Sequence, residues 1–315
     1  MKRAFVFPGQ GSQSVGMGKE LGSAFPVAAQ VFEEVDDALG QNLTKLMYEG
    51  PMEDLTLTEN TQPALMAVSV AVARVLESEG KLKLSDVADF VAGHSLGEYS
   101  ALTAAGSLAL SDTARLLKAR GLAMQKAVPV GVGAMAALLG MDIGPVEEIV
   151  KEASAAGDGV CVAANDNADG QVVLSGNKEA VERAIELAKE KGVRKAMLLP
   201  VSAPFHCPLM QPAADAMAEK LADVVIAPPT APLVANVTAA DTSDPETIRR
   251  LLVEQVTGRV RWRESVLYMG TQEVEQLVEL GTGKVLTAMV RRINKAMTGT
   301  AIQSPADIEA FLQSL

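Results

Sequence analysis

Between residues 129 and 199, short apolar runs typical of strands alternate with patterns typical of amphipathic helices. This alternation is compatible with only a few folds. Read as secondary structure, the patterns follow the order strand, helix, strand, strand, helix, strand. The expected elements lie at 134–139, 145–155, 160–164, 171–174, 178–191 and 194–199. This order is the split β-α-β pattern of a ferredoxin-like unit. We therefore expect residues 129–199 to form a small domain of that kind.

The segments on either side of this region alternate in a different way. Strands are expected at 4–7, 89–92 and 233–235, and helical patterns at 17–39, 63–79, 111–127 and 208–221. Strands that alternate with helices predict an α/β domain with a parallel sheet. At 315 residues the chain is also long for one ordinary domain. We expect residues 1–128 and 200–315 to form one larger α/β domain, into which the ferredoxin-like domain is inserted.

Composition and charge restrict the functions that are open to the chain. Hydrophobic residues make up 48% of it, enough for a substantial core. The net charge of −11 argues against nucleic acid and anionic membrane as partners, and no apolar run is long enough to span a bilayer. Two cysteines, and an N-terminal apolar stretch too short for a signal peptide, favour the cytoplasm.

The sequence also argues against a metal site and a bound nucleotide. It has two histidines and no Cys/His pair at the spacing of metal ligands. None of its glycine-rich loops fits a P-loop or a G-x-G-x-x-G motif. We expect no metal and no cofactor.

A G-x-S-x-G motif at residues 93–97 lies between an expected strand and an expected helix. A strand that turns sharply into a helix exposes the hydroxyl of Ser95, and flanking glycines remove Cβ atoms that would clash. The backbone N–H of Leu96 would then lie at a helix N-terminus, ready to donate to an oxyanion. This turn predicts an α/β-hydrolase-like large domain with Ser95 as nucleophile. The alternative is an ordinary turn in which Ser95 only caps the helix.

A nucleophilic serine needs a base, and His206 is the candidate by elimination. His94 is adjacent to Ser95, so its side chain should leave the turn in another direction. His206 lies in a loop at 202–208 that contains two prolines and precedes a helix. The alternative is a histidine near a helix N-terminus without a catalytic role.

Arg120 is the third candidate, because it is a cation in the middle of an apolar helix face. On a helical wheel its neighbours on that face are Leu116, Leu117, Ala123, Met124 and Ala127. Burying a guanidinium costs several kcal/mol unless an anion meets it. A structural Asp or Glu is one possible partner. A substrate carboxylate is the other, since arginine offers it a bidentate contact.

Several segments, taken together, resemble one known family. The matching residues are FPGQGSQ at 7–13, TQPA at 61–64, GHSLGEYSA at 93–101, KARGLAMQ around Arg120, His206 with Cys207, Gln255, and 279–285. They follow the family's order along nearly the whole chain. On these residues the chain is similar to the malonyl-CoA:acyl-carrier-protein transacylases.

The resemblance implies a ping-pong reaction with two substrates. Ser95, activated by His206, takes the malonyl group from malonyl-CoA as an ester. The phosphopantetheine thiol of an acyl carrier protein then accepts it. The resemblance further implies oxyanion donors at the backbone N–H groups of Gln10 and Leu96, and it implies that Arg120 binds the malonyl carboxylate.

Four supporting residues follow from the same resemblance. Gln255 matches a residue whose backbone carbonyl orients the base, and Asn165 aligns with a small-domain loop that borders the site. Met124 and Phe205 are the other two supporting residues that we expect at the site. Bacterial fatty-acid members often carry serine where Phe205 stands, and malonyl-selective polyketide acyltransferases carry phenylalanine. Malonyl preference is therefore implied, with fatty-acid synthesis as the expected pathway and a polyketide pathway as the alternative.

Two rival functions remain at this point. A serine thioesterase or esterase would use the same Ser95 and His206. In α/β-hydrolases, however, the histidine comes near the C-terminus, and Arg120 has no role in an ordinary esterase. A degenerate scaffold that binds carrier protein is the non-enzyme rival, and the presence of Ser95, His206 and Arg120 argues against it.

Overall fold

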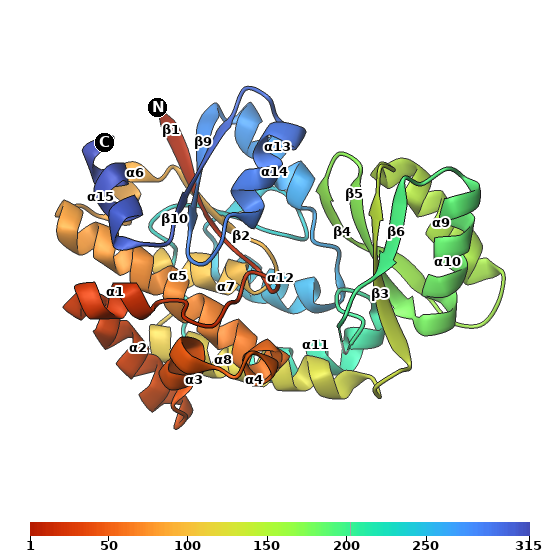
Figure 1. Cartoon of the computed structure of the whole chain (residues 1–315), viewed down its shortest axis with the longest axis horizontal. Coiled ribbons are helices and arrows are strands. Elements are labelled where there is room, and N and C mark those ends of the chain that lie inside the picture. The colour runs from red at the N-terminus through yellow and green to blue at the C-terminus, as the bar shows by residue number, and fades with distance from the viewer. Residues whose placement is uncertain (202) are drawn as a thin grey trace.

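The first strand, β1 (Lys2–Phe7), lies inside the larger of two sheets in the computed structural model, which describes residues 1–201 and 203–315 (Figure 1). Among these residues the sheet has the order β10-β9-β1-β2-β7-β8. The other strands are β2 (Phe90–Gly93), β7 (Leu233–Val234), β8 (Asp241–Thr242), β9 (Val274–Leu280) and β10 (Thr298–Ile302). All neighbours are parallel except β7 and β8. The expected α/β fold with a parallel sheet is confirmed, with a short antiparallel strand added at one edge.

β1 is buried on both faces, which explains its unbroken apolar sequence. Phe5 and Phe7 belong to one hydrophobic cluster, whereas Ala4 and Val6 belong to a second. Successive side chains of a strand point to opposite faces, so the two clusters lie on the two sides of the sheet. Strands covered on both faces have near-continuous apolar sequences.

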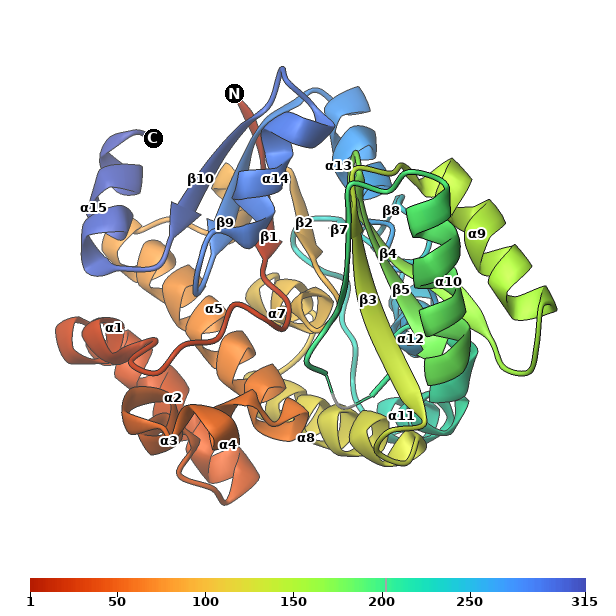
Figure 2. The same cartoon turned by 45° about the vertical axis from the view of Figure 1, so that its right-hand side comes forward.

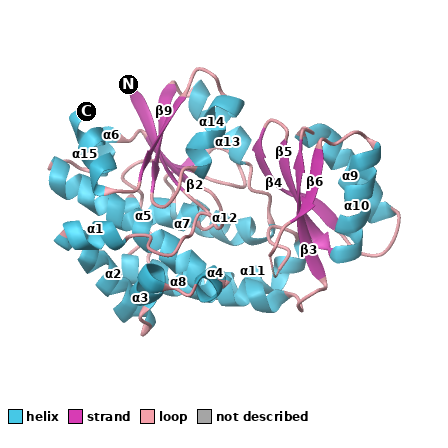
Figure 3. Ribbon diagram, viewed as in Figure 1, coloured by secondary structure: helices cyan, strands magenta, loops and turns pink. Residues whose placement is uncertain are grey.

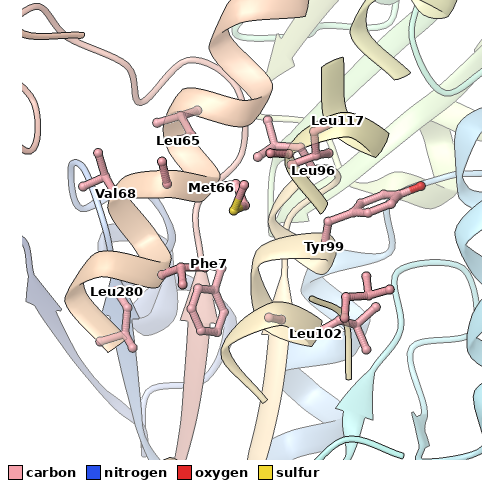
Figure 4. Packing of buried hydrophobic residues seen from close by; sticks show 14 of the residues in the cluster. Phe7, Leu65, Met66, Val68, Leu96, Tyr99, Leu102, Leu117 and Leu280 are labelled. Carbon is pink, nitrogen blue, oxygen red and sulfur yellow. The ribbon is translucent and has the colours of Figure 1, made fainter. Parts of the chain in front are cut away.

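Helices cover both faces of this sheet (Figures 1 and 3). The cluster of Phe5 and Phe7 includes residues of α5 (Thr58–Gly80), α7 (Gly97–Ala104), α8 (Leu110–Ala127), α11 (Gln211–Ala222), α12 (Pro245–Thr257) and α15 (Pro305–Gln313). The opposite cluster includes residues of α13 (Trp262–Thr271) and α14 (Val285–Ile293). Figure 4 shows Phe7 between side chains of α5 and α7. The end of β1 is thereby fixed next to the start of α7.

The smaller sheet is antiparallel and has the order β4-β5-β3-β6 (Figure 2). Its elements are β3 (Gly133–Leu139), α9 (Ile143–Ala155), β4 (Cys161–Ala168), β5 (Gln171–Asn177), α10 (Lys178–Glu190) and β6 (Lys195–Leu198). Both helices pack on one face, around a cluster that includes Leu138, Ile149 and Leu174. The expected β-α-β-β-α-β order is confirmed.

The core of the smaller sheet supports the domain boundaries that the sequence suggested. Every buried residue of this third cluster lies between Ala136 and Ala188. We propose residues 129–199 as one domain, and residues 1–128 with 200–315 as the other.

One expected helix is wrong, and a proline explains the error. Instead of a single helix at 17–39, the chain forms α1 (Lys19–Ala24) and α2 (Pro26–Leu39). Phe25 between them is extended, with φ of −128°, because a residue before proline avoids the helical region. Pro26 is tolerated at the first position of α2, where its missing N–H costs nothing.

Other boundaries differ less. The helix expected from residue 63 begins at Thr58, so Pro63 lies within α5. The helix expected at 208–221 begins as a short 3-10 turn, η1 (Pro208–Met210). Three short helices were not expected: α3 (Leu43–Glu49), α4 (Met52–Thr56) and α6 (Leu84–Val87). Within 1–201 and 203–315, no helix combines the length and apolar character that crossing a bilayer requires.

The contact between α8 and α5 generates a stability prediction at Gly121. Alanine in a helix interior is ordinarily about 1 kcal/mol better than glycine. A Cβ at Gly121, however, would lie 2.5 Å from the Cα of Glu59 and 2.8 Å from the carbonyl carbon of Thr58, both backbone atoms. We expect Gly121→Ala to lower the free energy of unfolding by about 1–3 kcal/mol, measured by urea denaturation.

The matched control is Leu122→Ala, because Leu122 is the next residue of α8 and is exposed. Its free energy of unfolding should stay within about 0.5 kcal/mol of the unmodified protein. A Gly121→Ala variant that is more stable than the parent would show that the two helices are not in close contact.

Candidate active site

The turn that carries Ser95 is too tight for side chains at its two glycines. β2 ends at Gly93, α7 begins at Gly97, and Ser95 between them has a φ of 55°. A Cβ on Gly93 would lie 1.9 Å from the backbone carbon of Gly97. A Cβ on Gly97 would lie 2.2 Å from the carbonyl oxygen of Phe7 at the end of β1. The G-x-S-x-G pattern therefore reflects the close approach of α7 to the sheet.

His206 lies within hydrogen-bond distance of this serine. The Oγ of Ser95 is 2.8 Å from the Nε2 of His206. The Nδ1 of His206 is 2.7 Å from the carbonyl oxygen of Gln255 and 3.2 Å from that of Gly258. Carbonyl oxygens only accept, so Nδ1 carries the proton and Nε2 is left to accept from the serine hydroxyl. Two backbone carbonyls thus take the orienting part that a carboxylate has in a Ser-His-Asp triad.

The environment keeps His206 uncharged. Burial, and after it the positive charge of Arg120, lower the pKa of His206 to about 3. At neutral pH the imidazole is therefore in the form that can take up a proton.

Arg120 is buried in α8 and reaches the same serine. Its Nη2 donates to the Oγ of Ser95 at 3.1 Å and to the Oε1 of Gln255 at 2.8 Å. Its Nη1 donates to the Oε1 of Gln62 at 2.8 Å. All three acceptors are neutral. Within the described ranges no carboxylate forms an ion pair with Arg120.

Glu98 is the carboxyl group whose charge acts on Arg120, yet it does not neutralise it. Its side chain is fully buried in the first turn of α7, and burial raises its pKa to about 8. At pH 7 it is therefore mostly protonated. The guanidinium keeps its charge next to Ser95, and this favours a substrate carboxylate over a structural one.

A cavity of about 240 Å³ opens over Ser95, His206 and Arg120. The smaller sheet contributes to its wall through Met135 of β3 and Val173 of β5. A parallel bridge between Asn165 and Val260 joins β4 to the larger domain beside this cavity. The cavity therefore lies between the two sheets.

The structure brings the remaining predicted residues to the same place. Gln10, Leu96, Met124, Phe205 and Asn165 all line the cavity. Gln10 follows β1, and Leu96 is the N-cap of α7. The sixth, Gln255, does not line it but contacts three of the site's residues. Its backbone oxygen accepts from His206, its Oε1 accepts from Arg120, and its Nε2 donates to the backbone oxygen of Ser95 at 3.2 Å.

Some residues of the site were not expected from the sequence. Gln62 holds Arg120 from α5, and its Nε2 donates to the Sδ of Met124 at 3.7 Å. The TQPA match marked Gln62, but nothing in the sequence pairs it with a residue 58 positions away. The Nε2 of His94 lies 2.9 Å from the Oδ1 of Asn167 in β4, and both residues line the cavity beside Ser95. Asn236 is hydrogen-bonded to the turn that carries Ser95. The one sequence feature that could have indicated this residue is its position directly after the expected strand at 233–235.

Comparison with known proteins agrees with this geometry. The sequence profile of the acyl transferase domain family matches residues 4–305. The malonyl CoA-acyl carrier protein transacylase of Bacillus subtilis (strain 168) is 43% identical over 314 residues, covering 100% of this chain and 97% of that protein. The protein of the same name from Escherichia coli (strain K12) is 45% identical over 311 residues, covering 98% of each.

Solved structures with similar folds have related names. The acyl-carrier-protein S-malonyltransferase of Bartonella henselae has a TM-score of 0.97 and 55% identity, over 100% of this chain and 99% of that one. A malonyl-transacylase in complex with a type II polyketide synthase acyl-carrier protein has a TM-score of 0.95 and 42% identity, over 100% of both chains. The chain belongs to the acyl transferase domain family and, within it, to the malonyl CoA-acyl carrier protein transacylases.

Proposed function

We propose that the protein is an acyl-carrier-protein S-malonyltransferase, which moves the malonyl group of malonyl-CoA to the phosphopantetheine thiol of an acyl carrier protein. The observation that carries the proposal is the position of the Ser95 Oγ. It lies 2.8 Å from a neutral imidazole and 3.1 Å from a guanidinium that has no carboxylate partner in the described chain. The first contact suits a nucleophile, and the second suits an acyl group that ends in a carboxylate.

In the first half-reaction, the Oγ of Ser95 attacks the thioester carbon while its proton passes to the Nε2 of His206. The carbonyl oxygen becomes an oxyanion, for which the backbone N–H groups of Gln10 and Leu96 are the proposed donors. The carbon–sulfur bond then breaks. His206 gives its proton to the departing sulfur, and CoA leaves as a free thiol.

The second half-reaction runs the same steps with another thiol. The phosphopantetheine thiol loses its proton to His206 and attacks the ester carbon of malonyl-Ser95. The ester bond breaks, and the Oγ of Ser95 recovers a proton from His206. No charge has to leave the site in either direction, because His206 accepts and returns one proton in each half-reaction.

Arg120 supplies the selectivity in this proposal. In a malonyl group, one methylene separates the carboxylate from the reacting carbonyl carbon. A guanidinium in contact with the Ser95 Oγ can reach a carboxylate at that separation. In a buried site such a charged hydrogen bond is stronger than in water. An acetyl group has no carboxylate and cannot form this hydrogen bond with Arg120.

We further propose the cytoplasm as compartment and fatty-acid synthesis as pathway. Both cysteines, Cys161 and Cys207, are buried thiols, as suits a reducing environment. A polyketide pathway is the alternative. Hydrolysis by the same serine is the less suitable reaction, because it gives the buried charge of Arg120 no function.

The assignment of Ser95 is tested by its ester. Incubation with malonyl-CoA and no acceptor should add the mass of one malonyl group to the intact protein, and Ser95→Ala should abolish the addition. Transfer to carrier protein should fall by about 10³-fold or more, as for other nucleophilic serines. Ser111→Ala, a serine at the start of α8, is the control and should label normally. Continued labelling of the Ser95→Ala variant would show that another residue is the nucleophile.

The role of Arg120 is tested by comparing two acyl groups. Arg120→Ala removes a charge-assisted contact of roughly 2–5 kcal/mol, which corresponds to a loss of about 30- to 4,000-fold in kcat/KM for malonyl-CoA. Turnover of acetyl-CoA should hold steady or rise. Lys118→Ala removes a cation of the same helix that pairs with Glu59, and it should leave the malonyl-to-acetyl ratio unchanged.

The melting temperature of both variants completes this comparison. Equal losses for malonyl and acetyl groups in Arg120→Ala, together with a lowered melting temperature, would assign Arg120 to the fold and not to the substrate.

The low pKa of His206 predicts the pH dependence of the first half-reaction. The profile of kcat/KM reports the ionisation of groups in the free enzyme. Because the pKa of His206 is lowered to about 3, the base form persists as the pH falls well below the ordinary range of histidine. We expect kcat/KM for malonyl-CoA to be flat between about pH 5 and 7.5, measured by stopped-flow release of CoA. A tenfold fall per pH unit below about 6.5 would contradict the proposed environment of His206.

A further inference from the structure

Asn236 holds the turn of Ser95 with both polar atoms of its side chain. It follows β7, the strand that pairs with β2, and it is 1% exposed. Its Oδ1 accepts from the backbone N–H of Ser95 at 2.8 Å, and its Nδ2 donates to the backbone oxygen of Gly93 at 2.6 Å. The side chain thus spans the first half of the turn, from the last residue of β2 to the backbone N–H of the nucleophile.

The backbone of Asn236 is held as firmly as its side chain. Its N–H donates to the Oε2 of Glu98 at 2.8 Å, and its carbonyl oxygen accepts from the N–H of Arg261 at 3.0 Å. Glu98 lies in the first turn of α7, directly after the serine turn, so the contact closes a ring of hydrogen bonds around it. These four hydrogen bonds together hold the Asn236 side chain in a single orientation.

The turn needs such a support because of its backbone conformation. Ser95 has a φ of 55°, in the left-handed region that residues other than glycine rarely adopt. Such conformations persist only where the surroundings over-determine them. Asn236 also takes up the N–H of Ser95, which is therefore not a donor for an oxyanion. That task is left to the neighbouring N–H groups.

Asn236 does not line the cavity, and in the described chain it makes no hydrogen bond to His206 or Arg120. Of the three residues Ser95, His206 and Arg120, only Ser95 is hydrogen-bonded to it. We propose that Asn236 is a positioning residue that fixes the angle at which the Ser95 hydroxyl meets its base, and that Glu98 holds Asn236 in place. This inference rests on the proposed role of Ser95 as nucleophile.

The test measures the reactivity of Ser95 with two reagents. Malonyl-CoA reports the natural half-reaction, and a fluorophosphonate reports an activated serine without needing a malonyl group. Single-turnover labelling by each is followed by intact mass, well below the melting temperature of every variant. If the unmodified protein reacts with the fluorophosphonate but not with malonyl-CoA, the proposed substrate is wrong, and the inference is still decided by the fluorophosphonate rates.

In Asn236→Ala both labelling rates should fall about 10- to 100-fold, since small misplacements of a reacting group have effects of that size. The malonyl-CoA concentration at half-maximal rate should change less than about threefold, because no substrate contact is lost. The control is Asn177→Ala in the smaller sheet. It removes a comparable side-chain bond, from the N–H of Val160 to the Oδ1 of Asn177 at 2.7 Å. It should lower the melting temperature and leave both labelling rates unchanged.

Glu98 provides a second pair of variants that does not depend on the folding of Asn236→Ala. Glu98→Ala removes the acceptor of the Asn236 N–H and should slow labelling about tenfold. Glu98→Gln keeps a neutral oxygen at that place, much like the protonated acid, and should recover most of the lost rate. Equal rates in Glu98→Ala, Glu98→Gln and the unmodified protein would overturn the inference. So would an Asn236→Ala variant that is less stable but labels at the parent rate.

Discussion

Arg120 keeps its charge in the protein interior, where the described residues offer it only neutral hydrogen-bond acceptors. Burying an unpaired guanidinium costs several kcal/mol of free energy. The side chains around Arg120 reduce this cost through hydrogen bonds. The amides of Gln62 and Gln255 each accept one hydrogen bond from its Nη atoms, while its buried Nε has no hydrogen-bond partner among the described residues. Its charge helps to lower the pKa of His206, while burial outweighs its effect on Glu98 and raises the pKa of that carboxyl group. Burial, with this cation as the second cause, thus keeps His206 neutral, and the cation itself has no ionised carboxylate beside it in the described chain.

The larger sheet explains why residues so distant in sequence meet around this cation. β1, β2 and β7 are parallel, so their carboxyl ends lie at one edge, where ligands bind in open α/β sheets. Gln10, Ser95 and Asn236 each follow one of these three strands. The helices then add Arg120 from α8 and Gln255 from α12. Gln10, Ser95 and Asn236 therefore come from loops that follow strands, whereas the positive charge of Arg120 comes from the helical layer.

The sequence predicted the parts of this arrangement that depend on local patterns. The ferredoxin-like order, the parallel sheet and the strand-to-helix turn at Ser95 all follow from apolar periodicity and glycine spacing. The break at Pro26 was missed because the helical pattern continues on both sides of it. Gln62 and Asn236 could not be assigned, because their partners lie far away in the chain and a buried amide has no characteristic pattern. Arg120 was recognisable because a charge on an apolar face is conspicuous within a single helix.

The cavity wall has a consequence for how such a protein can diversify. Ser95, Arg120 and His206 belong to the segments 1–128 and 200–315, whereas Met135 and Val173 of the opposing wall belong to the smaller sheet. The proposed reacting atoms and part of the cavity wall above them are therefore encoded in separate stretches of the gene. A mutation at Met135 or Val173 changes the room above the serine without touching its hydrogen bonds. Selection can then explore new acyl groups in one stretch while the chemistry is conserved in the other.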